Sequence, residues 1–122
     1  MPRFVVAPGA AGDMEEILSH TFKVHGEAAA LRYEALMVRA IVDVAAEPGR
    51  PGVNARDEIS LSMLTYHLAH SRANASQEVG RVRRPRHFLL FRRRDDGTVE
   101  IGRVLHDSMD LARHLPEAYR QP

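Results

Sequence analysis

The feature that most restricts the fold is a pair of helical patterns separated by a single residue, Gly26. Residues 13–25 place their apolar side chains on one helical face, and residues 27–47 carry a wider apolar stripe. One glycine leaves room only for a reversal of the chain, so these segments predict an antiparallel helical hairpin. Asp13 and Glu16 have capping-box spacing, which predicts that the first helix begins at Asp13.

Several strand patterns flank the predicted hairpin. Residues 4–7 form a short β-rich run before it, and the Pro/Gly segment 48–52 ends its second helix. Residues 59–63 and then 64–68 alternate apolar and polar side chains, with a change of phase between the two ranges. This pattern predicts strand segments joined by a bulge or bend. Residues 71–84 are polar and predict a long hairpin loop.

The C-terminal part predicts a β-hairpin followed by a short helix. Residues 87–92 form an apolar run, Asp95-Asp96-Gly97 is a strong turn signal, and residues 99–106 predict the next strand. Residues 108–115 predict a last helix that stops at a proline. The element order is β-α-α-β-β-β-α, so we expect an α+β fold with a small antiparallel sheet packed against the helical hairpin. A length of 122 residues predicts a single domain over 1–122.

The net charge of +1 conceals an uneven distribution along the chain. Residues 1–61 carry six basic and nine acidic side chains, whereas residues 62–122 carry eleven arginines and seven acidic side chains. Between Arg72 and Arg94 there are eight arginines and only one acidic residue. Two interpretations stay open: a solvated face with a compositional bias, or a guanidinium-rich surface that binds phosphate or carboxylate groups.

Composition also excludes several classes of chemistry. The chain has no cysteine, which rules out disulfides, thiolate metal sites and a cysteine nucleophile. Its histidines match no recognisable zinc pattern, and no glycine loop of the phosphate-binding type is present. We therefore expect no metal and no cofactor. No signal-peptide or membrane-spanning pattern is found, so we expect a cytoplasmic protein.

The C-terminal segments resemble a known family. The segments RHFLLFR (86–92) and VEIGRVLHD (99–107), joined through the Asp95-Asp96-Gly97 turn, are similar to the ending of the RelE/ParE toxin superfamily of type II toxin–antitoxin systems. The resemblance is nearer to the ParE (plasmid stabilisation) branch. Met109-Asp110-Leu111 matches the family's R-D-L continuation, except that Met109 replaces an arginine. The element order agrees over nearly the whole chain, and the loop at 71–84 is longer than in compact members.

The resemblance implies a small toxin that arrests growth and is neutralised by a cognate antitoxin. ParE-like members inhibit DNA gyrase and carry no catalytic site, so we expect a protein inhibitor. We expect the target to be bound by basic and histidine side chains of the C-terminal half, namely Arg83, Arg84, Arg86, Arg103 and His106. We expect the antitoxin to cover a sheet edge and apolar positions of the helical hairpin, including Phe22, Leu31, Val38 and Val42.

Two alternatives stay open. RelE-like members cleave mRNA on the ribosome without metal, which requires an acid, a base and cations near the scissile phosphate. In this chain those roles would fall to His87, Arg92, Arg103 and His106, although Lys23 is its only lysine and the lysine-rich set of the best-known mRNases is absent. The second alternative is an inactive binding module with a toxin fold, which the replacement at Met109 favours.

Overall fold

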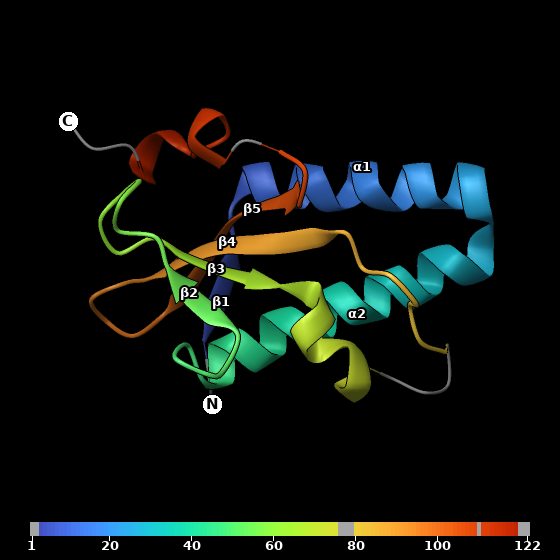
Figure 1. Cartoon of the computed structure of the whole chain (residues 1–122), viewed down its shortest axis with the longest axis horizontal. Helices are drawn as coiled ribbons and strands as arrows, with labels where there is room; N and C mark the ends of the chain where they lie inside the picture. The colour runs from blue at the N-terminus through green and yellow to red at the C-terminus, as the bar shows by residue number, and fades with distance from the viewer. Residues whose placement is uncertain (1–2, 76–79, 110, 120–122) are drawn as a thin grey trace.

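The computed structural model describes residues 3–75, 80–109 and 111–119, and the predicted helical hairpin is its longest feature (Figure 1). Helix α1 spans Pro8–His25 and helix α2 spans Glu27–Ala46. The chain reverses at Gly26, whose φ of 92° is a conformation that side chains with a Cβ rarely adopt. The hairpin prediction is therefore confirmed. No helix in these ranges is long and apolar enough to cross a membrane.

The predicted start of the first helix at Asp13 is wrong. Helix α1 begins five positions earlier, at Pro8, where the fixed φ and missing N–H of proline suit the first helical position. Asp13 lies inside the helix, and its carboxylate accepts hydrogen bonds from Arg103 and not from the helix backbone. The capping-box spacing in the sequence was thus coincidental.

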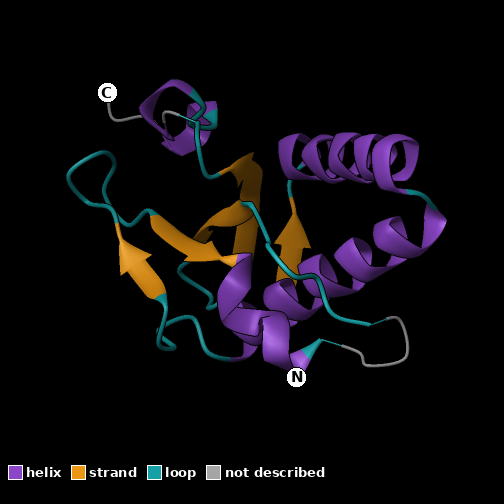
Figure 2. Cartoon of the chain, turned by 45° about the vertical axis from the view of Figure 1, so that its right-hand side comes forward, coloured by secondary structure: helices purple, strands orange, loops and turns teal. Residues whose placement is uncertain are grey.

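A five-stranded sheet has the order β1-β5-β4-β3-β2, with the hairpin on one side (Figure 2). The last four strands form an antiparallel meander, with one strand more than predicted, whereas β1 pairs with β5 in parallel. The strand that follows the helices is β2, at the opposite edge of the sheet, and the meander brings its last strand, β5, beside β1 in the same direction. The α+β prediction is confirmed, with a mixed sheet. The strands are β1 (Phe4–Val6), β2 (Val53–Ala55), β3 (Leu64–His67), β4 (His87–Arg93) and β5 (Val99–His106).

Strands β4 and β5 contain an irregularity that matters for the site. Phe91 pairs with Ile101, but the preceding residue, Leu90, pairs with Arg103. Gly102 is therefore an extra residue on β5, which is the definition of a β-bulge. The bulge shifts the pairing of residues 87–90 of β4 with β5 by one position.

Three local predictions are wrong. Residues 59–63 form turns, because Asp57 accepts the backbone N–H of Ser62, which has a φ of 64°. The edge strand there is the unpredicted β2, at Val53–Ala55. The helix predicted at 108–115 is replaced by 3-10 turns at Leu111–Arg113 and Glu117–Tyr119, with residue 110 outside the described ranges. The loop predicted at 71–84 begins as a 3-10 helix over Leu68–Asn74, and its residues 76–79 lie outside the described ranges.

The core has one apolar cluster on each face of the sheet. Alternate residues of β4 point to opposite faces, so Leu89 and Phe91 pack toward the hairpin and Leu90 packs away from it. Helix α2 supplies Leu36 and Met37 to the first cluster. The second cluster is completed by side chains that follow β5, including Leu111 and Tyr119.

Candidate functional site

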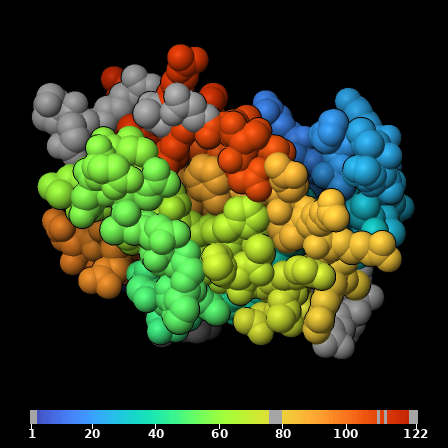
Figure 3. All heavy atoms as spheres, viewed as in Figure 1, coloured from blue at the N-terminus to red at the C-terminus, as the bar shows by residue number. Residues whose placement is uncertain are grey.

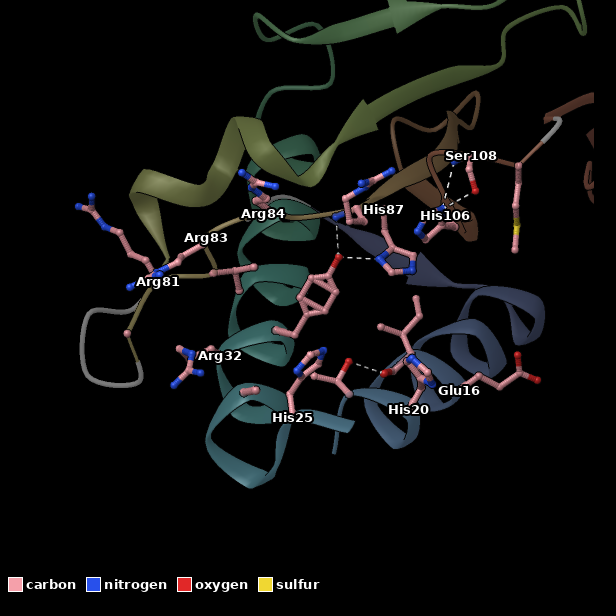
Figure 4. A pocket seen from close by; sticks show the side chains of 18 residues that line it. Glu16, His20, His25, Arg32, Arg81, Arg83, Arg84, His87, His106 and Ser108 are labelled. Carbon is pink, nitrogen blue, oxygen red and sulfur yellow. Dashed lines mark hydrogen bonds between the residues drawn. The ribbon is translucent and has the colours of Figure 1, made fainter. Parts of the chain in front are cut away.

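A cleft of about 1380 Å³ opens where the helical hairpin, the segment 80–87 and the end of β5 meet. Helices α1 and α2 form one wall, the segment 80–87 forms the other, and the end of β5 closes the cleft (Figure 4). The 80–87 segment lies at the surface beside the end of β5 (Figure 3). The ionisable lining residues are Glu16, His20, His25, Arg32, Tyr33, Arg81, Arg83, Arg84, Arg86, His87 and His106.

Tyr33 of α2 fixes His87 at the floor of the cleft. The Tyr33 hydroxyl lies 2.5 Å from Nδ1 of His87 and accepts the backbone N–H of Arg86 at 3.1 Å. The hydroxyl keeps one proton that it can donate to Nδ1, and in that tautomer neutral His87 carries its own proton on Nε2. Burial, together with neighbouring His106, lowers the pKa of His87 to about 4, so the ring is neutral at pH 7. Burial also raises the pKa of Tyr33, so its hydroxyl keeps its proton.

His106 is the cross-strand partner of His87. The two ring centroids are 5.2 Å apart and the ring planes are nearly perpendicular. Nδ1 of His106 accepts the backbone N–H of Ser108 at 3.1 Å and lies 2.7 Å from the hydroxyl of Ser108. The cleft floor therefore holds two imidazoles and a phenol, which are groups able to donate and accept protons.

Asp107 neutralises one of the arginines beside this cluster. Nη2 of Arg86 lies 3.0 Å from Oδ1 of Asp107, and Nε2 of His67 lies 3.1 Å from Oδ2. Hydrogen bonds from Arg86 and His67 hold the pKa of Asp107 below its usual range. Arg86 is thus held in an ion pair and is less available to a ligand than its neighbours.

The other arginines at the cleft have no such partner. Arg32, Arg81, Arg83 and Arg84 form no ion pair with any carboxylate in the described part of the chain. The side chain of Arg32, on α2, packs against the backbone of Gly80, on the facing wall. A Cβ atom added at Gly80, where φ is +85°, would lie only 3.0 Å from Cδ of Arg32. The cleft is therefore bordered by four guanidinium groups whose charge is not compensated by a described carboxylate.

Comparison with known proteins assigns the family. Residues 4–111 match the family model described as the ParE toxin of the type II toxin–antitoxin system parDE. The chain belongs to the ParE toxin family. A search of curated proteins finds no match. The match spans the hairpin, the sheet and the cleft, so the ParE-like resemblance seen in the C-terminal segments is confirmed for most of the chain.

Membership of the ParE family gives the chain its general role. ParE proteins are the toxins of type II toxin–antitoxin systems, and each is paired with a cognate antitoxin of the ParD type. The chain is therefore a toxin component with an antitoxin partner.

Arg103, one of the predicted target contacts of this ParE toxin, joins β5 to α1. Its Nε and Nη2 atoms lie 2.7 Å and 2.9 Å from the two carboxylate oxygens of Asp13. The same carboxylate accepts the backbone N–H of Val104, and Nη1 of Arg103 donates to the backbone of His114. Most of the donor capacity of Arg103 is therefore used within the fold.

Arg92 is similarly engaged, at the opposite end of β4 from the cleft. Its Nε lies 3.1 Å from Oε1 of Glu100, and its guanidinium lies 4.6 Å from the ring centroid of Tyr119. Although partial burial opposes ionisation, Arg94 and Arg92 hold the pKa of Glu100 below its usual range. Of the four residues named for mRNA cleavage, the structure brings together only His87 and His106.

Three of the four positions expected to bind the antitoxin are exposed on the helical hairpin. The exposed fractions are 55% for Phe22 on α1, 46% for Leu31 and 49% for Val38 on α2. Val42 is half-buried against the fold. Leu31 and Val38 are seven residues apart and thus share one face of α2, which is an apolar face that the described chain leaves open.

The sequence did not indicate the roles of Tyr33 and Arg32. Tyr33 appeared only as part of the apolar stripe of α2, because a helical pattern does not reveal where a hydroxyl points. Arg32 lay in the acidic half of the chain, far in sequence from the arginines it joins in space. Within residues 3–75, 80–109 and 111–119, no three His, Asp or Glu side chains are grouped to hold a metal ion.

Proposed function

We propose that this ParE-family toxin acts in the cytoplasm by binding and inhibiting DNA gyrase, as a protein inhibitor without catalysis of its own. The observation that carries the proposal is the dispersal of the groups needed for RNA cleavage. Arg92 and Arg103 are paired with Glu100 and Asp13, away from the two histidines. A phosphorane transition state needs a cation beside the acid and base, and these two arginines are not available for it.

The cleft arginines supply the proposed target surface. Arg83 and Arg84 are exposed and have no carboxylate partner in the described ranges, so they can reach an acidic surface of gyrase. His106 borders the same cleft. The exposed apolar positions Phe22, Leu31 and Val38 of the hairpin are the proposed antitoxin contact, and none of the three lines the cleft.

One observation favours a second candidate function, ribosome-dependent mRNA cleavage. Tyr33, His87 and His106 lie together in a cleft with positive side chains on its border. In that mechanism His106 would take the proton of the ribose 2′-OH, and Arg83 or Arg84 would stabilise the phosphorane. An inactive toxin-fold module is the third candidate, and Met109, exposed at the mouth of the cleft, is consistent with it.

Expression of the chain without its antitoxin separates these functions. Growth is followed while gyrase supercoiling and mRNA cleavage on programmed ribosomes are assayed in parallel with the purified chain. Inhibited supercoiling with intact mRNA is the expected result. Cleaved mRNA with normal supercoiling would establish the second function, and normal growth with neither effect would establish the third.

Matched variants make the assay specific for the cleft. The double variant Arg83→Ala/Arg84→Ala should relieve inhibition of gyrase, whereas Arg93→Ala on the far end of β4 should not. A His87→Gln variant, which keeps the proposed target contact His106, should still inhibit gyrase. If that variant alone abolished toxicity, a catalytic role for His87 would replace the proposal.

A further inference from the structure

The cleft carries an excess of positive side chains. Arg32, Arg81, Arg83 and Arg84 border it without a carboxylate partner in the described part of the chain, while Glu16 is the single carboxylate among the described lining residues. Four guanidinium groups and one carboxylate leave a local charge of +3. Arginine forks of this kind bind phosphate oxygens in pairs.

The floor adds a neutral donor directed by Tyr33. When the Tyr33 hydroxyl donates to Nδ1 of His87, the proton of the neutral ring is on Nε2. That atom has no hydrogen-bond partner among the described residues. It is also not sealed from solvent, since the only fully buried side-chain nitrogen or oxygen without a partner in those residues is Nε of Arg50. In this tautomer the N–H of His87, a residue that lines the cleft, is open to solvent.

We propose that this cleft binds the phosphate chain of a nucleoside polyphosphate, with the arginines on the phosphate oxygens and the Nε2–H of His87 donating to one of them. The apolar side chains of Ile17 and Val82, on opposite walls, would border the nucleoside. Nothing in this binding requires gyrase or the antitoxin, so the proposal does not rest on the proposed function. Its failure would leave the gyrase assay unaffected.

The arrangement fits a compact polyphosphate better than a nucleic-acid strand. A triphosphate concentrates about three to four negative charges within a few ångströms, which matches a net +3 confined to one cleft. Single-strand binding instead needs a row of aromatic side chains on which successive bases stack. Tyr33 is the one tyrosine or phenylalanine among the described lining residues, and its hydroxyl is already committed to His87.

Titration calorimetry with the full-length chain tests the proposal, using adenosine, AMP, ADP and ATP, with inorganic triphosphate as a competitor. We expect affinity to rise with each added phosphate, triphosphate to displace ATP, and binding to weaken between about 50 and 200 mM salt. No measurable binding of ATP at about 1 mM would overturn the proposal. Tighter binding of a short single-stranded oligonucleotide than of ATP would also overturn it, in favour of a nucleic-acid surface.

Two variants distinguish the cleft from general surface charge. Arg83→Gln/Arg84→Gln should weaken ATP binding by about tenfold or more, the loss expected for removing charge-assisted hydrogen bonds. Arg93→Gln carries the same charge change at the far end of β4 and should bind ATP as the parent chain does. Equal losses in both variants would overturn the proposal. Tyr33→Phe should release the proton from Nε2 to either ring nitrogen of His87, which ¹⁵N chemical shifts report, and should weaken ATP binding without altering its salt dependence.

Discussion

His87 lies directly opposite His106, with ring centroids 5.2 Å apart, because β5 contains one residue more than its partner strand at the bulge. Gly102 is the residue left without a cross-strand partner. An unbroken register from the turn would place His87 opposite Leu105, an apolar core residue. The pairing of the two imidazoles at the cleft floor is therefore a consequence of the bulge.

Gly102→Ala should destabilise the protein. An added Cβ would lie 2.8 Å from the hydroxyl oxygen of Tyr119 and 3.1 Å from Cγ of Pro116, so buried groups would have to move. We expect a loss of about 1–3 kcal/mol in the free energy of unfolding, measured by urea denaturation. Gly12→Ala is the matched control, since a Cβ there meets nothing within 4 Å inside a helix, and it should be neutral or stabilising. Equal stability of both variants would contradict the packing described for Gly102.

This bulge also explains why the sequence predicted the site only in part. The alternating pattern around Asp95-Asp96-Gly97 placed His87 and His106 on neighbouring strands, since turn chemistry and side-chain alternation are local signals. The exact register depends on an extra residue whose position is decided by packing against Tyr119 and the turns after β5. Arg32 reaches the cleft through the fold of the hairpin, which no local pattern records.

The stability of the protein should fall between about pH 6.5 and pH 4. His87 has a pKa of about 4 in the folded chain and an ordinary value of 6.5 when unfolded. Between these values the unfolded state binds the proton and the folded state does not, so the free energy of unfolding decreases as the pH falls. Asp107 and other carboxylates with a lowered pKa reduce the free energy of unfolding only in a more acidic range, at and below their ordinary pKa values.

Urea denaturation at about pH 7 and about pH 5 isolates this effect. His87→Gln should lose less stability over the interval than the parent chain, because it has no imidazole to protonate on unfolding. His20→Gln, at an exposed position on α1, should keep the parental dependence. A parental dependence in His87→Gln would show that His87 is not buried in its neutral form.

Asp13→Asn should destabilise the fold by weakening the link between α1 and β5. The carboxylate of Asp13 accepts two hydrogen bonds from Arg103 and one from the backbone of Val104, and an amide cannot satisfy all three. Hydrogen bonds to charged groups contribute about 1.5–3 kcal/mol, so we expect a loss of that order, seen as a lower urea midpoint with an unchanged slope. Asp95→Asn, in the exposed turn, should leave the midpoint unchanged.

Replacing Arg83, Arg84 and Arg86 by alanine should weaken binding to the target and flatten its salt dependence. Exposed guanidinium groups act mainly through long-range attraction, which salt screens, so their removal lowers both the affinity at low salt and its decline with added salt. The slope is measured from gyrase binding at several salt concentrations. Arg93→Ala supplies the control, and an unchanged slope in the triple variant would exclude these arginines from the interface.

The hairpin was the most predictable part of the fold, and β2 the least. Gly26 and the two apolar stripes specify the reversal locally, whereas Val53–Ala55 is a three-residue edge strand with no alternating pattern of its own. Residues 59–63 alternate like a strand, yet the capping of Ser62 by Asp57 closes them into turns. Side-chain capping competes with sheet formation here, and pattern alone does not show which prevails.

Val38→Asp should abolish antitoxin binding while leaving the toxin folded. Val38 is 49% exposed on the open face of α2, so a carboxylate there remains solvated in the free chain and is desolvated only beneath a partner. We expect loss of the complex in co-purification and retained toxicity even when the antitoxin is co-expressed. Leu61→Asp is the control, because Leu61 is 69% exposed in a turn outside the hairpin, and it should still be neutralised. If both variants were neutralised normally, the antitoxin would have to bind elsewhere, and the hairpin face would lose its proposed role.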